Sequence, residues 1–79
     1  MTEETDEDRL RLLEGHAETA YSAMYDARDN SAATAHYSNA KEALYTAIGL
    51  AKKLGKLQLA ERLSKRLAHI KAVFRSQFS

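Results

Sequence analysis

Basic side chains follow one another at helical spacing in the last third of the chain. Lys65 and Arg66 stand three and four residues after Arg62, and His69 continues the same face of a helix. A stripe of positive charge of this kind can bind phosphate groups and therefore nucleic acids. No aromatic residue interleaves with the stripe, so the pattern does not favour base stacking. Phosphate binding by Arg62, Lys65 and Arg66 is one hypothesis for a functional site.

Tyrosine is the second residue type that could serve a site. Tyr21 and Tyr25 are one helical turn apart, and Tyr45 lies beside a later apolar stripe. Tyrosine offers a partner a large apolar area with a polar tip, and it is enriched at the centres of interfaces. We predict Tyr21, Tyr25 and Tyr45 as partner-binding residues, together with Phe78. The alternative is that the tyrosines close the edges of the core with their hydroxyls in water.

The sequence shows no pattern typical of catalysis or metal binding. His16, His36 and His69 each lack a second histidine three or four residues away, which a metal site on one helix would need. The chain has no cysteine, so disulfides and thiolate chemistry are excluded. Its three glycines are isolated and form no phosphate-binding loop. We predict no catalytic residue, no bound metal, no cofactor and a non-enzymatic function.

The candidate residues must be positioned by helices, because helical periodicity runs through most of the chain. Fourteen alanines and ten leucines stand against three isoleucines and valines together, which favours helix over strand. In three segments, apolar residues recur at alternating steps of three and four, the period of a helix-bundle seam. The seam positions are Leu10, Leu13, Ala17, Ala20, Met24 and Ala27; then Ala33, Tyr37, Ala40, Leu44, Ala47, Ala51 and Leu54; then Ala60, Leu63, Leu67, Ile70 and Phe74.

Two helix ends are marked by capping signals. Thr5 is followed three residues later by Asp8, the arrangement of a capping box at a helix start. Gly55 follows the basic last turn of the second segment and suits a left-handed C-cap. The first connection is less sharply marked, and we place it between residues 29 and 37.

These signals predict an all-α single domain over residues 1–79, with helices at about 6–29, 36–54 and 57–77. The short second connection makes its two helices antiparallel neighbours. We expect an up-down-up three-helix bundle, which is an antiparallel helical hairpin with an N-terminal packing helix. Alanine dominates the first two seams and larger residues the third. The first two helices should therefore pack closely, with the third over their joint groove.

Charge is unevenly divided along the chain. Residues 1–30 carry nine acidic and three basic side chains, a net charge of −6, whereas residues 31–79 carry two acidic and nine basic ones, a net charge of +7. Such asymmetry marks either a nucleic-acid surface or two elements that pack against each other. In the expected topology the acidic start of the first helix lies beside Lys52, Lys53 and Lys56. We therefore favour complementarity within the fold.

The segment from Tyr37 to Ala47 resembles the second helix of a tetratricopeptide repeat, with residues at the family's steps. These residues are Tyr37, Ala40, Leu44 and Ala47. The tract 51–55 followed by 67–70 is similar to the passage into the first helix of a next repeat. The preceding helix departs from the pattern, because Ala27 and Arg28 stand where the family has Leu-Gly.

The chain as a whole also resembles the MIT domain, a three-helix module of about this length. The partial counterparts are Ala17, Ala20, Tyr37, Ala40, Leu44 and Tyr45. Both families bind peptides or helices. The two resemblances therefore imply a protein-interaction module.

The sequence thus predicts a small non-enzymatic helical module that binds a partner protein or peptide, or forms a homodimer. Nucleic-acid binding through the basic face of the third helix is the alternative. The longest apolar run is far below the roughly 20 residues of a membrane span, so we expect no membrane association. The acidic, polar start of the sequence is unlike a signal peptide, and the expected location is cytoplasmic.

Overall fold

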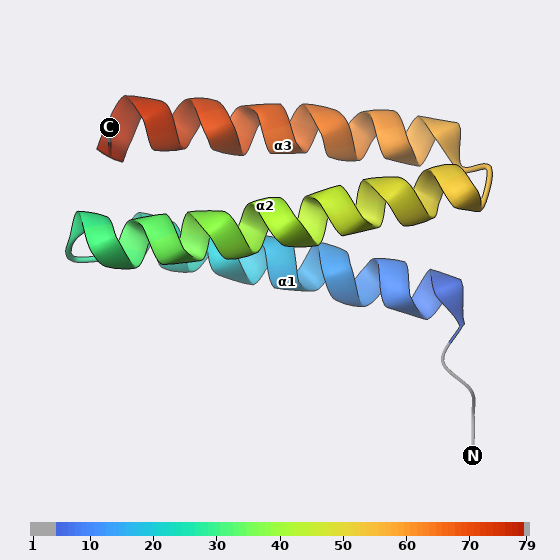
Figure 1. Ribbon diagram of the computed structural model, residues 1–79, viewed down its shortest axis with the longest axis horizontal. Coiled ribbons are helices and arrows are strands. Elements are labelled where there is room, and N and C mark those ends of the chain that lie inside the picture. The colour runs from blue at the N-terminus through green and yellow to red at the C-terminus, as the bar shows by residue number, and fades with distance from the viewer. Residues whose placement is uncertain (1–4, 79) are drawn as a thin grey trace, which may run out of the picture.

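The computed structural model describes residues 5–78, except for the side chain of Phe78. It contains three helices, α1 (Asp6–Asp26), α2 (Asn30–Lys53) and α3 (Leu57–Phe78), and the described residues include no strand. Figure 1 shows successive helices running in opposite directions, with the two connections at opposite ends. The predicted all-α, up-down-up three-helix architecture is confirmed.

The capping box predicted at the start of α1 is present. The Thr5 hydroxyl accepts a hydrogen bond from the Asp8 N–H at 3.1 Å, and the Thr5 N–H donates to the Asp8 carboxylate at 3.4 Å. The pKa of Asp8 is lowered from its usual 3.8, first by the interaction of its carboxylate with the Thr5 side chain and then by the hydrogen bond from the Thr5 backbone N–H. Two free N–H groups at the helix start are thereby satisfied.

The first connection is shorter and earlier than predicted, because α1 ends at Asp26 and α2 begins at Asn30 instead of residue 36. Ala27 leaves the helix with an extended backbone, at φ −64° and ψ 138°. The Asp29 carboxylate then accepts a hydrogen bond from the Ala32 N–H at 2.7 Å, which caps α2. Once Asp29 caps the helix, the alanines that follow have the highest helix propensity and join α2.

The predicted left-handed cap closes α2. Gly55 has φ +76°, a conformation that costs glycine little. The Lys56 N–H donates to the Ala51 carbonyl at 2.8 Å and the Gly55 N–H to the Lys52 carbonyl at 3.0 Å. These two bonds form a Schellman motif, which turns the chain directly into α3.

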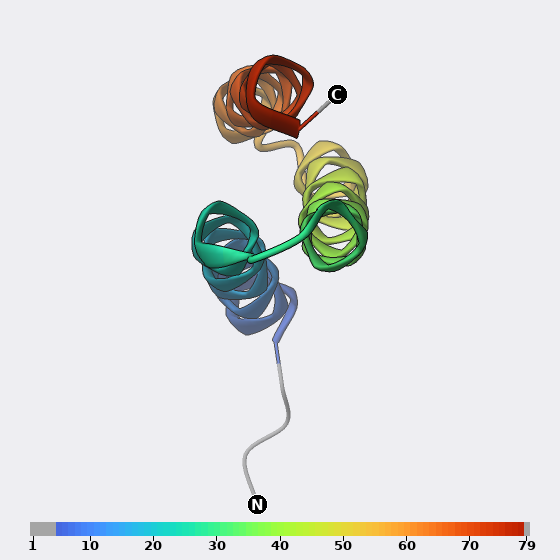
Figure 2. The same ribbon diagram turned by 90° about the vertical axis from the view of Figure 1, so that its left-hand side faces the viewer.

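The helices form an open arrangement with α2 at the centre. α1 packs against α2 and α2 against α3, whereas the backbones of α1 and α3 come close at few points of the described chain. Figure 2 shows the helices end-on, with α2 displaced to one side between α1 and α3. The overall dimensions are 40 × 29 × 13 Å. The expectation that the third helix covers the joint groove is met only in part. α3 lies beside α2 and reaches α1 through long side chains.

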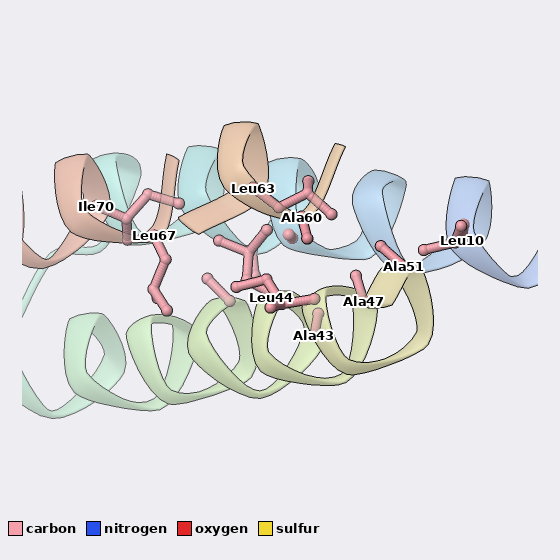
Figure 3. Packing of buried hydrophobic residues seen from close by; sticks show 13 residues of the cluster. Leu10, Ala43, Leu44, Ala47, Ala51, Ala60, Leu63, Leu67 and Ile70 are labelled. Atoms are coloured by element: carbon pink, nitrogen blue, oxygen red, sulfur yellow. The ribbon is translucent and has the colours of Figure 1, made fainter. Parts of the chain in front are cut away.

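The core lies where the three helices face one another. Figure 3 shows Ala60 and Leu63 of α3 and Leu44 of α2 directed toward one another. Ala43 and Ile48 are also buried, although the predicted seam does not include them. They widen the buried arc of α2 to about 140°, since each residue turns the helix by about 100°. A helix with two neighbours needs this wider arc, which a single seam does not describe.

Candidate functional site

Acidic residues of α1 meet the basic stripe of α3. The Arg66 guanidinium donates two hydrogen bonds to the Glu18 carboxylate, Nε to Oε2 at 2.9 Å and the second to Oε1 at 2.5 Å. These bonds raise the pKa of Arg66. At the start of the same pair of helices, Lys56 Nζ lies 3.3 Å from the Glu7 carboxylate. The predicted complementarity within the fold is therefore present at two points between α1 and the region that follows α2.

The three residues predicted to bind phosphate lie in different surroundings. Arg66 is paired with Glu18, and Lys65 Nζ lies 3.5 Å from the Glu61 carboxylate one turn earlier on α3. Arg62 lines a shallow groove of about 310 Å³ with Glu14 and Glu18. A phosphate group at this stripe would have to compete with carboxylates already in place. The arrangement supports the nucleic-acid alternative less than it supports pairing within the fold.

Tyr21 is part of the contact between α1 and α3. Its ring lies edge-on to Tyr25, with ring centroids 5.6 Å apart, and to His69, at 6.1 Å. Its hydroxyl is 3.4 Å from His69 Nε2, and the Arg66 guanidinium carbon lies 4.8 Å from the centroid of its ring. Tyr21 is half-buried by these contacts, whereas Tyr25 is 53% exposed. Tyr25 therefore offers the larger free surface of the two.

The predicted partner-binding residues do not gather at one site. Tyr45 contacts Lys71 of α3, whereas Tyr21 contacts His69. Residues two apart on a helix point about 160° away from each other, so Lys71 and His69 lie on nearly opposite sides of α3 and the two tyrosines are separated by that helix. The side chain of Phe78, the fourth predicted residue, lies outside the described residues.

A groove that sequence reasoning missed runs between α1 and α2. It has a volume of about 550 Å³, and no residue of α3 lines it. Small apolar side chains from both helices line it, together with a row of polar ones. The lining residues are Leu13, His16, Thr19, Ala20, Ala23, His36, Asn39, Glu42, Ala43 and Thr46. The sequence signal that could have indicated the groove is the pair of alanines beside the predicted seams, at positions 23 and 43.

The groove brings together two of the three histidines, His16 and His36. Across residues 5–78, no three His, Asp or Glu side chains converge in a way that could hold a metal ion. None of the helices in the described part of the chain combines the length and the apolar character of a membrane span.

Comparison of the chain with protein families, curated proteins and solved structures found no match. A three-helix fold serves many unrelated functions, so the function has to be inferred from the surfaces themselves.

Proposed function

We propose that this protein is a small non-enzymatic helical module that binds a segment of a partner protein in the groove between α1 and α2. The observation that carries the proposal is the groove itself, about 550 Å³ in volume and not covered by α3. Ala20, Ala23 and Ala43 line it, and small side chains let the backbone of a bound segment approach closely.

The polar lining fits recognition of a peptide or helix. Thr19, Asn39 and Thr46 can each donate and accept hydrogen bonds, and Glu42 can accept them. An apolar floor with hydrogen-bonding groups at its edges is the usual composition of a protein-interaction surface. A helix would contact such a groove through residues three and four apart.

The resemblance to tetratricopeptide repeats and MIT domains agrees with this proposal and does not carry it. Ala40, Leu44 and Ala47 are buried and Tyr37 is half-buried. The residues that carry the resemblance are thus packing residues, which any alanine-rich helical hairpin would need. A second copy of the chain is an alternative occupant of the groove, since association would add buried surface to a domain of 79 residues. The cytoplasmic location that we propose rests on the sequence alone.

Site-specific photocrosslinking tests the proposal. A photoreactive phenylalanine derivative replaces Thr19, which lines the groove, or Ser22, an exposed residue of α1 that does not. Irradiation in the cells that make the protein should give a discrete protein adduct from position 19 and none from position 22. The mass of the adduct distinguishes a second copy from another protein. Equal adducts from both positions, or none from position 19, would contradict the proposed site.

A further inference from the structure

A second charged surface lies between α2 and α3, on the side of α3 away from the Glu18–Arg66 pair. Lys71 Nζ of α3 donates a hydrogen bond to the Tyr45 hydroxyl of α2 at 2.7 Å. Lys41 stands one helical turn before Tyr45. We call Lys41, Tyr45 and Lys71 the lysine–tyrosine cluster. Tyr45 is 54% exposed, so the cluster is open to a partner.

Both lysines of the cluster have neutral partners. Lys41 Nζ lies 4.7 Å from the centroid of the Tyr37 ring, and Lys71 bonds the Tyr45 hydroxyl. Among the ion pairs of the described residues, none includes Lys41 or Lys71. This differs from the basic stripe, where Lys65 and Arg66 are paired. An ammonium group has three N–H donors, so each lysine retains donors and an uncompensated charge.

The charges of both lysines also act on the Tyr45 hydroxyl. Its pKa is lowered, first by the hydrogen bond from Lys71 and then by the charges of Lys71 and Lys41. Because the Tyr45 oxygen accepts from Lys71, its own O–H is directed elsewhere and can donate to an added ligand. Three donor groups are therefore available to an anion: the ammonium groups of Lys41 and Lys71 and the Tyr45 hydroxyl.

The neighbouring aromatic rings favour a carboxylate ligand over a nucleic acid. Tyr37 is stacked on Phe74, with ring centroids 4.0 Å apart and planes 3° from parallel. Lys41 lies over the Tyr37 ring as well. Tyr37 is thus already stacked and covered, and Lys71 Nζ lies over the more exposed Tyr45 ring, 5.1 Å from its centroid. A surface that binds single-stranded nucleic acid presents several free rings to successive bases.

We propose that the lysine–tyrosine cluster docks an acidic segment of a partner protein, whose carboxylates bind Lys41 and Lys71 and accept a hydrogen bond from Tyr45. Charge complementarity is the driving force, and each exposed ion pair contributes little. The interaction is therefore modest in affinity, needs several carboxylates, and weakens as salt is added. This surface is separate from the groove between α1 and α2, and crosslinking from Thr19 does not depend on it.

Fluorescence anisotropy with a labelled oligoglutamate peptide tests the proposal at low ionic strength. We expect the double variant Lys41→Gln, Lys71→Gln to bind the peptide about tenfold more weakly than the natural protein. The matched control is Lys52→Gln, Lys53→Gln, which removes the same charge from exposed positions in the last turn of α2. The control should lose less than about twofold. Circular dichroism establishes that both variants keep their helices.

Several outcomes would overturn the proposal. Failure of the natural protein to bind oligoglutamate, or an equal loss in both double variants, would leave no specific site. Equal or tighter binding of an oligothymidylate of the same length, lost in the same variant, would identify a phosphate ligand instead. Concentration-dependent association in light scattering that is lost in the Lys41→Gln, Lys71→Gln variant would identify a second copy as the occupant.

Discussion

Arg66 of α3 and Glu18 of α1 form a two-bond ion pair across 48 residues of sequence. The contact matters because the backbones of α1 and α3 approach each other at few points in the described chain. Each of these helices packs along α2, and the direct contact between α1 and α3 is made mainly by side chains. Tyr21 adds its ring to the same contact, 4.8 Å from the Arg66 guanidinium carbon.

Removing the carboxylate of this pair should destabilise the fold modestly. We expect Glu18→Gln to lower the free energy of unfolding by about 1 kcal/mol, at the upper end for a pair that solvent still reaches. Urea denaturation followed by circular dichroism measures the change. Glu61→Gln, which breaks the exposed pair with Lys65 within α3, is the control and should cost about 0.3–0.5 kcal/mol. A larger loss in Glu61→Gln would contradict the role given to the Glu18–Arg66 pair.

The same contact shows how far charge patterning alone could predict the structure. The opposite charges of the two parts of the chain, with the short second connection, predicted that α1 would face basic residues. They pointed to Lys52, Lys53 and Lys56, of which only Lys56 forms an ion pair with α1 among the described residues. The pairing of Glu18 with Arg66 depends on the register between α1 and α3, which no local sequence signal determines.

The capping box at Thr5 predicts both a loss of stability and a change in its pH dependence. Thr5→Ala removes the hydroxyl that bonds the Asp8 N–H, and a lost N-cap costs about 1 kcal/mol. Because the folded state lowers the pKa of Asp8, the ionised carboxylate stabilises the fold above the unfolded value of 3.8. That contribution is lost as the pH falls through the lower folded pKa.

Thermal unfolding at several pH values checks this prediction. The natural protein should lose stability as the pH falls through and below 3.8, and Asp8→Asn should lose less over that range. The difference in stability between the natural protein and the Thr5→Ala variant should also become smaller toward low pH. A difference that stays constant with pH would show that the Thr5 side chain does not act on the Asp8 carboxylate.

The two glycines at positions 49 and 55 should respond to alanine in opposite directions. An added Cβ at either position meets no atom within 4 Å, so space does not distinguish them. Gly49 lies inside α2 and is exposed, and alanine there should stabilise the protein by up to about 1 kcal/mol. Gly55 has φ +76°, and alanine there should destabilise it by about 1–2 kcal/mol. Chemical denaturation of both variants measures the signs, and the same sign for both would contradict this account.

The helix boundaries separate what local sequence signals determine from what they do not. The Gly55 C-cap and the Thr5 capping box were predicted correctly. Each has a residue typical of a helix end, and the apolar helical repeat begins or ends beside it. The start of α2 was placed too late, because Asp29 is followed by alanines that extend the helical pattern in both directions. The groove between α1 and α2 was not predicted, since it exists only because α3 packs on the other side of α2.

The hydroxyl of Tyr45 should titrate at lower pH than an ordinary tyrosine. Its pKa is lowered from 10.0 by the hydrogen bond from Lys71 and by the charges of Lys71 and Lys41. We expect Lys71→Met to raise the pKa of Tyr45 toward 10.0, and Lys41→Met to raise it by less, because Lys41 contributes charge alone. Tyrosinate absorbance during an alkaline titration measures the effect, and Tyr45→Phe identifies which of the four tyrosines is responsible. An unchanged titration in Lys71→Met would show that the 2.7 Å contact between Lys71 and Tyr45 does not persist in solution.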